Sequence, residues 1–261
     1  MELYGLIGVA SYCLVSLVIG VRLLALARRT RELPECLIGT GFLVGGAFGY
    51  TALVVAAQLL AANPHASPLL FLAGWGGLVA ASLCLLFFWQ RVYHPGLAVG
   101  RWIAALGSAV LVTSFVGFVL ADSAGVELAA NPWYLPGLLL QGGAYAINGW
   151  ASSRHYSKLR RRLPLGLVDP VVVNRILLWS AAAWAITLQY VYSVSYMLST
   201  GARVTGGFAT AVISSLGLVA AGTMALAFFP PARYRHRIQR AAAAGGAEEL
   251  REHAAPPVLE K

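Results

Sequence analysis

The chain has 261 residues, of which 59% are hydrophobic and 11% are charged, and its formal net charge is +9 at pH 7. A soluble domain carries about 25% charged residues, so this composition excludes an ordinary soluble globular protein. The basic residues lie between long apolar segments. We therefore interpret the positive charge as a signal for orientation in a membrane and expect no nucleic-acid partner.

Seven apolar segments are long enough to cross a bilayer core of about 30 Å at a rise of about 1.5 Å per residue. They span residues 3–27, 36–61, 68–90, 101–121, 136–153, 170–198 and 206–229. This pattern predicts an all-α, polytopic membrane protein with a seven-transmembrane-helix bundle over residues 1–231. Residues 232–261 are predicted to form a basic juxtamembrane segment and a disordered cytoplasmic tail.

The positions of Lys and Arg predict the orientation of the bundle. With the N-terminus outside and the C-terminus cytoplasmic, eighteen of the nineteen basic residues lie on the cytoplasmic side, and only Arg203 lies outside. Seventeen of the nineteen are Arg, which is typical of a GC-rich bacterial genome. We therefore expect a multi-pass protein of a bacterial inner membrane.

The second segment is rich in glycine. Gly39, Gly41, Gly45, Gly46 and Gly49 place small residues along much of this helix. Small residues allow a neighbouring helix to approach closely, so we expect tight packing here. The alternative is a flexible hinge.

Polar side chains recur along one face of the fifth and of the sixth segment. Gln141, Tyr145, Asn148 and Ser152 are spaced 4, 3 and 4 residues apart, and Ala185, Gln189, Tyr192 and Tyr196 repeat the pattern. Uncharged donors, acceptors and aromatic rings at one depth suit a pocket for a neutral or amphipathic small molecule. The predicted ligand-binding residues are Gln141, Tyr145, Asn148, Trp184, Gln189, Tyr192, Tyr196 and Ser214. The alternative is that these groups bond neighbouring helices together.

A second group of candidates lies at the cytoplasmic surface. Glu35, Asp169 and Arg175 could form an ion-pair cluster that acts as a gate or binds a lipid headgroup. Helix capping is the favoured alternative, because Asp169 precedes Pro170 at the predicted start of a helix.

The sequence offers no pattern for catalysis. No Asp, Glu, Lys or His lies in the middle of a segment, which argues against proton relays and ion pumps. The seventh segment has no lysine that could anchor retinal, so a retinal-binding protein is excluded. No Cys or His spacing suggests a metal site, and Cys13, Cys36 and Cys84 are interpreted as packing residues. We expect no cofactor, no metal and no enzymatic activity.

A weak internal repeat accompanies this pattern. Residues 26–50 and 159–184 both run from a basic cluster, through Pro34-Glu35 or Asp169-Pro170, into an apolar segment. With the fourth segment as an inverter, this resembles the three-plus-one-plus-three plan of sugar-efflux and PQ-loop transporters. The Pro-Gln dipeptide of that family is absent here.

The expected function is a non-enzymatic facilitator or permease for a small uncharged or amphipathic solute, with its site between the fifth, sixth and seventh segments. One alternative is a receptor-like ligand sensor that acts through cytoplasmic partners. Another is a packing subunit of a membrane complex. The expected partners are the lipid bilayer, a small-molecule ligand, and a second copy of the chain or a membrane-complex partner.

Overall fold

The computed structural model describes residues 2–62, 68–121, 131–201 and 207–241, and the elements within these ranges are all helices. They are α1 (Glu2–Thr30), α2 (Leu33–Gly41), the π-helix η1 (Phe42–Gly49), α3 (Tyr50–Ala62), α4 (Pro68–Tyr93), α5 (Ala98–Leu120), α6 (Tyr134–Arg162), α7 (Pro170–Thr200) and α8 (Gly207–Phe228). The expected all-α class is confirmed.

Six helical stretches within the described residues are long and apolar enough to cross a membrane. They are Tyr4–Thr30, Leu33–Leu59, Leu69–Tyr93, Ala98–Leu120, Pro170–Thr200 and Gly207–Phe228. Large apolar side chains cover their outer surfaces; Trp102, for example, is 68% exposed. These features indicate a multi-pass membrane protein. The fifth predicted segment corresponds to α6, which is less apolar because it carries Gln141, Asn148 and a basic end.

One segment predicted to be a loop is helical. Residues 154–162, expected as a loop, form the last turns of α6, since nothing between Gly149 and Pro164 breaks a helix and terminal cations complement the helix dipole. Residues 232–241 of the predicted tail are also helical. The predicted turn at residues 63–65, residues 122–130 of the next outer loop, Arg203 and residues 242–261 lie outside the described residues.

The second predicted segment contains a π-helix that the sequence pattern does not reveal. In η1 the backbone N–H of Tyr50 donates to the carbonyl of Gly45, the i→i+5 pattern of a widened turn. A Cβ at Gly45 would overlap the Cβ of Ala81 on α4, and a Cβ at Gly49 would come within 3.0 Å of the Gly74 carbonyl oxygen. Glycine therefore lets the backbones of η1 and α4 lie against each other.

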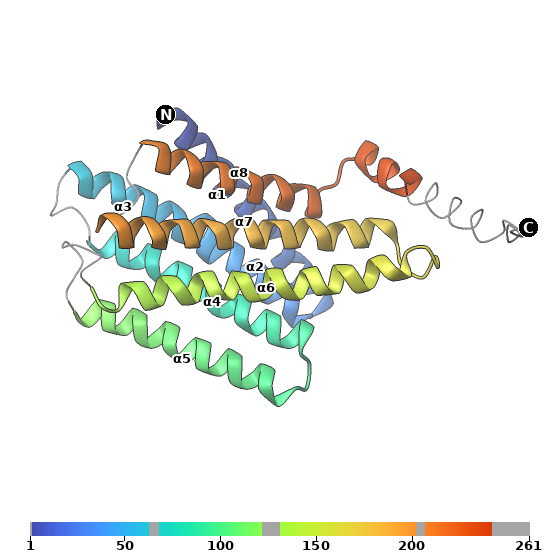
Figure 1. Cartoon of the computed structure of the whole chain (residues 1–261), viewed down its shortest axis with the longest axis horizontal. Helices are drawn as coiled ribbons and strands as arrows, with labels where there is room; N and C mark the ends of the chain where they lie inside the picture. Colours follow the sequence, from blue (N-terminus) through green and yellow to red (C-terminus); the bar gives the residue numbers. More distant parts are fainter. Residues whose placement is uncertain (1, 63–67, 122–130, 202–206, 242–261) are drawn as a thin grey trace, which may run out of the picture.

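The helices form a closed ring with one helix outside it. Around the ring, the continuous stretch α2–η1–α3 packs between α1 and α4, α4 packs on α6, α6 on α7, α7 on α8, and α8 on α1. Helix α5 packs against α4 and α6 from outside (Figure 1). The three helical segments before α5 (α1, α2–η1–α3 and α4) and the three after it (α6, α7 and α8) make equivalent contacts. In each set the first segment packs on the second and the second on the third. The first segment of each set also packs on the third segment of the other set, α1 on α8 and α6 on α4.

The two ends of the bundle differ in charge. The α1–α2, α4–α5 and α6–α7 connections and the segment after α8 lie at one end (Figure 1, right). That end carries the basic clusters at residues 28–31, 154–162 and 233–240. Arg22 also reaches it, since its guanidinium donates to the Phe228 carbonyl (2.9 Å) near the end of α8.

Close packing between η1 and α4 can be tested with Gly45→Leu. The added side chain would have to displace Ala81, and overpacking of this kind typically costs about 1–3 kcal/mol. We expect a lower yield of folded protein and a lower melting temperature in detergent. Gly143→Leu is the matched control, because a Cβ at Gly143 would meet no atom within 4 Å. Equal stability of the two variants would show that the glycines of η1 are not needed for packing.

Candidate ligand cavity

The ring of helices surrounds a cavity of about 520 Å³, which lies in the half of the bundle away from the basic end. It is lined by Gly8, Val9 and Tyr12 of α1, Tyr50, Leu53, Val54 and Ala57 of α3, Leu78 of α4, Tyr134, Leu138 and Tyr145 of α6, Ile186, Gln189, Tyr190, Ser193 and Met197 of α7, and Ile213, Ser214 and Gly217 of α8. Small-molecule sites typically occupy about 300–1,000 Å³. The cavity is therefore large enough for a small solute.

The chemistry of this lining is apolar with uncharged polar groups added. Five tyrosines, Gln189, Ser193 and Ser214 supply hydroxyl and amide groups, and none of the lining residues carries a charge at neutral pH. The Gln189 side chain and the Tyr50 phenol both line this cavity. An ion would lose its hydration here without gaining a counter-charge, so the lining favours an uncharged or amphipathic molecule.

A tyrosine bridge closes the inner end of the cavity. Tyr12 of α1 and Tyr145 of α6, together called the tyrosine bridge, both line the large cavity and a smaller cavity beyond them. The Tyr145 ring stacks on Tyr190 with centroids 5.9 Å apart, and the Tyr12 ring meets Tyr50 edge-on at 5.5 Å. Four aromatic rings from four helical segments thus form the bridge and lie between the two cavities.

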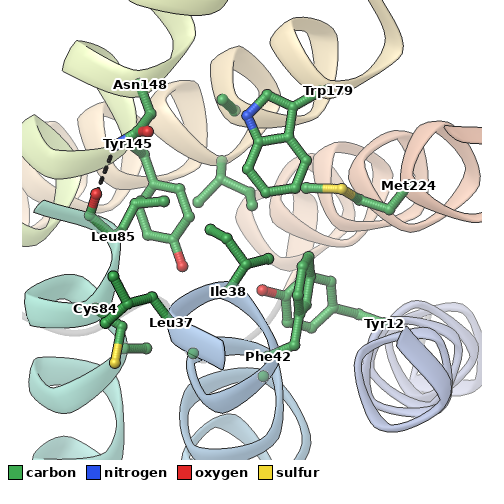
Figure 2. A pocket seen from close by; sticks show the side chains of 15 residues that line it. Tyr12, Leu37, Ile38, Phe42, Cys84, Leu85, Tyr145, Asn148, Trp179 and Met224 are labelled. Carbon is green, nitrogen blue, oxygen red and sulfur yellow. Dashed lines mark hydrogen bonds between the residues drawn. The ribbon is translucent and has the colours of Figure 1, made fainter. Parts of the chain in front are cut away.

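The smaller cavity, of about 40 Å³, lies between the bridge and the basic end (Figure 2). Its lining is Tyr12, Leu37, Ile38, Gly41, Phe42, Gly46, Ala81, Cys84, Leu85, Tyr145, Asn148, Trp179, Ala183, Ile186 and Met224. The side chain of Asn148 is fully buried, and its Nδ2 donates to the carbonyls of Leu85 (3.2 Å) and Ala144 (2.9 Å). The second cavity extends the first along the axis of the ring.

The structure brings only part of the predicted ligand site together. Tyr145, Gln189 and Ser214 line the large cavity, and Asn148 lines the small one together with Tyr145. Trp184, Tyr192 and Tyr196 line neither. The lining also includes α1, α3 and α4, so the cavity is wider than the predicted site between the fifth, sixth and seventh segments.

Gln141 is placed behind the cavity wall. Its side chain has no exposed surface, and its Oε1 accepts a hydrogen bond from the Tyr190 hydroxyl (2.9 Å). Gln141 therefore joins α6 to α7 and orients the ring on which Tyr145 stacks. This is the helix-bonding arrangement that the sequence left as the alternative to a ligand contact.

The remaining predicted residues of α7 contact other parts of the protein. The Trp184 Nε1 donates to the Ser153 hydroxyl (3.1 Å), and the indole packs over Gly149 of α6. The rings of Tyr192 and Tyr196 stack on each other with centroids 6.5 Å apart. These residues stabilise the surface of α7 and its contact with α6.

The cytoplasmic candidates do not form an ion pair among the described residues. The Glu35 carboxylate accepts a hydrogen bond from the Thr30 hydroxyl, and Asp169 Oδ1 accepts from the Val171 N–H (2.8 Å) at the start of α7. Arg175 is exposed. The capping role expected for Asp169 is thus confirmed, and the structure supplies no contact that would make these three residues a gate.

Sequence reasoning missed Tyr50, Tyr134, Tyr190 and Ser193. On α7 the lining residues are Ile186, Gln189, Tyr190, Ser193 and Met197, a face that shares Gln189 with the predicted stripe but is rotated away from Tyr192 and Tyr196. Ser193 follows Gln189 by four residues and Tyr190 by three, a helical spacing that can be read from the sequence. Tyr134 lies at the start of α6 and Tyr50 in the middle of the stretch α2–η1–α3, and no repeating polar pattern marks either residue.

Comparisons with known proteins give no indication of the function. No protein-family model, curated protein or solved structure matches the chain. Among the described residues, no three His, Cys, Asp or Glu side chains gather in a way that could hold a metal ion. The function therefore has to be argued from the geometry and chemistry of the cavities.

The bond between Gln141 and Tyr190 gives a direct test of their structural role. Gln141→Leu should lower the free energy of unfolding by about 0.5–2 kcal/mol, because it leaves the Tyr190 hydroxyl without its acceptor. In a double-mutant cycle with Tyr190→Phe, we expect a coupling of about 0.6 kcal/mol or more. The control cycle with Gln189→Leu should be additive. Coupling of Gln141 to Gln189 together with no coupling to Tyr190 would contradict the bond between Gln141 and Tyr190.

Proposed function

We propose that this protein is a seven-helix, non-enzymatic facilitator or permease for a small uncharged or amphipathic solute. The observation that carries the proposal is the large cavity enclosed by helices from both halves of the chain, with a second cavity beyond the tyrosine bridge. In this proposal α6 is the seventh membrane-crossing helix. Its polar residues face the inside of the ring or α7, which removes them from lipid.

The symmetry of the ring supports transport. Helices α1, α2–α3 and α4 occupy positions equivalent to those of α6, α7 and α8. Residues from corresponding helices meet at the centre: Tyr12 and Tyr145 line both cavities, and Phe42 packs edge-on against Trp179 with centroids 6.2 Å apart (Figure 2). A site between two repeated halves is the arrangement that lets one half rock against the other to change access.

The tyrosine bridge is the proposed closed gate. Movement of the Tyr12 and Tyr145 side chains, which line both cavities, would join the two cavities without exposing any buried charge. We propose that the large cavity faces outside and that the small cavity lies toward the cytoplasm.

The orientation follows from the charge at the two ends. We place the basic end in the cytoplasm of a bacterial cell, with the N-terminus outside and the C-terminus inside, because cytoplasmic loops carry the excess of Lys and Arg. Trp150 supports an interface at this end, since the Arg154 guanidinium lies 4.8 Å from its ring centroid. Exposed tryptophan and snorkelling arginine are typical of residues at the membrane surface.

Cysteine labelling tests this orientation. In a background with Cys13, Cys36 and Cys84 replaced by Ala, Ser157→Cys and Ala241→Cys should react with a membrane-impermeant maleimide only after the cells are opened. A cysteine at Ala124 should react in intact cells. Labelling of Ser157→Cys in intact cells, with Ala124→Cys protected, would reverse the topology.

Blocking the large cavity tests transport. A Cβ at Gly217 would meet no atom within 4 Å although this residue lines the cavity, so Gly217→Leu should fill the cavity without disturbing the helices. Gly222→Leu on the exposed side of the same helix is the matched control. In proteoliposomes, reswelling after an osmotic shock should be faster than in empty vesicles for at least one solute among glycerol, erythritol and short-chain alcohols. We expect Gly217→Leu to abolish this faster reswelling and Gly222→Leu to retain it.

Two outcomes would overturn the proposal. If no uncharged solute passes faster than through empty vesicles, but such a solute raises the melting temperature of the wild type and not of Gly217→Leu, the chain is a ligand sensor. If neither effect is found and the protein co-purifies with a membrane complex, it is a packing subunit.

A further inference from the structure

The small cavity contains two buried polar atoms that the folded chain does not satisfy. They are Oδ1 of Asn148 and Nε1 of Trp179, each without a hydrogen-bond partner among the described residues. Both side chains line this cavity, and the indole nitrogen of Trp179 lies on the edge of the ring that faces Asn148 (Figure 2). An unsatisfied buried donor or acceptor costs about 1–3 kcal/mol, so two in one small cavity require an explanation.

The orientation of the Asn148 amide is set by its neighbours. Its nitrogen donates to the carbonyls of Leu85 and Ala144 at 3.2 Å and 2.9 Å. A flipped amide would place its oxygen against these two carbonyl oxygens, which would be repulsive. The amide oxygen therefore remains the free acceptor, while the indole N–H of Trp179 can act only as a donor.

We infer that Asn148 and Trp179 form a hydroxyl-binding subsite beyond the tyrosine bridge. A bound group must accept a hydrogen bond from the indole N–H and donate one to the Asn148 oxygen. A hydroxyl does both, whereas an ether or ketone cannot donate and an ammonium cannot accept. The volume of about 40 Å³ admits a group of about the size of a water molecule.

The hydroxyl can come from two sources with the same chemistry. One is a water molecule held permanently in the cavity. The other is the hydroxyl of a solute that reaches past Tyr12 and Tyr145 from the large cavity, and only this second source rests on the proposed function. Either source satisfies both atoms, so the subsite itself does not depend on transport.

A double-mutant cycle on the purified protein tests whether the two residues share one bound group. Asn148→Leu and Trp179→Phe should each lower the melting temperature, by about 2–4 °C per kcal/mol lost in a protein of this size. The double variant should lose less than the sum of both, because the first change already removes the shared group. Trp75→Phe is the control: the Nε1 of Trp75 is equally buried and unpartnered, but Trp75 lines neither cavity. Its cycle with Asn148→Leu should be additive.

A second measurement detects the bound group itself, so direct packing between Asn148 and Trp179 does not contribute to its result. In protein with ¹⁵N-labelled tryptophan, the Trp179 indole signal is identified by its loss in Trp179→Phe. It should show a magnetisation-transfer peak to water, or to the hydroxyl of added cyclohexanol, and this peak should disappear in Asn148→Leu. Cyclohexanone, which cannot donate a hydrogen bond, should give no such peak.

The results separate the possibilities. A peak to water that cyclohexanol leaves unchanged identifies bound water, whereas a peak to cyclohexanol identifies a solute subsite; both support the inference. Additive melting temperatures for Asn148 and Trp179, together with no peak to either molecule, would overturn it. Because no transport is measured, a failure of the reswelling assay would leave this result intact.

Discussion

Polar groups in this chain have to find their partners inside the bundle. The outer surface is apolar, and a polar atom turned toward hydrocarbon cannot be hydrogen-bonded by water. The ring of helices meets this constraint in two ways. Some polar side chains are bonded across helix contacts, and the others gather around the cavities at the centre of the ring.

The contact between α6 and α7 shows the first solution. The hydroxyls of Ser153 and Ser180 lie 2.7 Å apart, and they lie 2.8 Å and 3.2 Å from the carbonyl oxygen of Gly149, so their two protons are shared among these three contacts. Trp184 and Gln141 add further bonds across the same contact. These bonds hold two helices at a fixed distance. The hydroxyls of Ser153 and Ser180 and the indole N–H of Trp184 are poor candidates for binding a solute because they are already bonded, whereas Nε2 of Gln141 has no partner among the described residues.

The cavities show the second solution. The Tyr12–Tyr145 bridge, Gln189 and the Asn148 amide keep polar groups at the centre of the ring, where α1, α3 and α7 converge with α6. Close packing elsewhere makes this opening possible. The glycines of η1 and α4 bring one side of the ring together backbone to backbone, whereas five tyrosines line the large cavity.

The sequence predicted the helices well, because long apolar segments with basic flanks allow few alternatives in a membrane. It predicted the cavity less well. The α6 stripe has the right face for Tyr145 and Asn148, but the amide of Gln141 is bonded to a tyrosine one helix away, and periodicity within one helix does not reveal such a partner. On α7 the stripe was rotated from Tyr190 and Ser193 toward Tyr192 and Tyr196. The π-helix was also missed, since it depends on how α4 packs against the glycines.

The most direct test of the account is whether the centre of the ring is reached by water from outside. Ser214→Cys replaces a lining hydroxyl by a thiol of similar size, and Val219→Cys places a thiol on the exposed, lipid-facing side of the same helix. In a background lacking the three native cysteines, a small uncharged methanethiosulfonate reagent added outside should modify Ser214→Cys rapidly and Val219→Cys slowly, because only a thiol in contact with water ionises to the reactive thiolate. Adding Gly217→Leu should protect Ser214→Cys. Equal, slow reaction at both positions would show that no water-accessible cavity exists in the outer half of the bundle and would contradict the account.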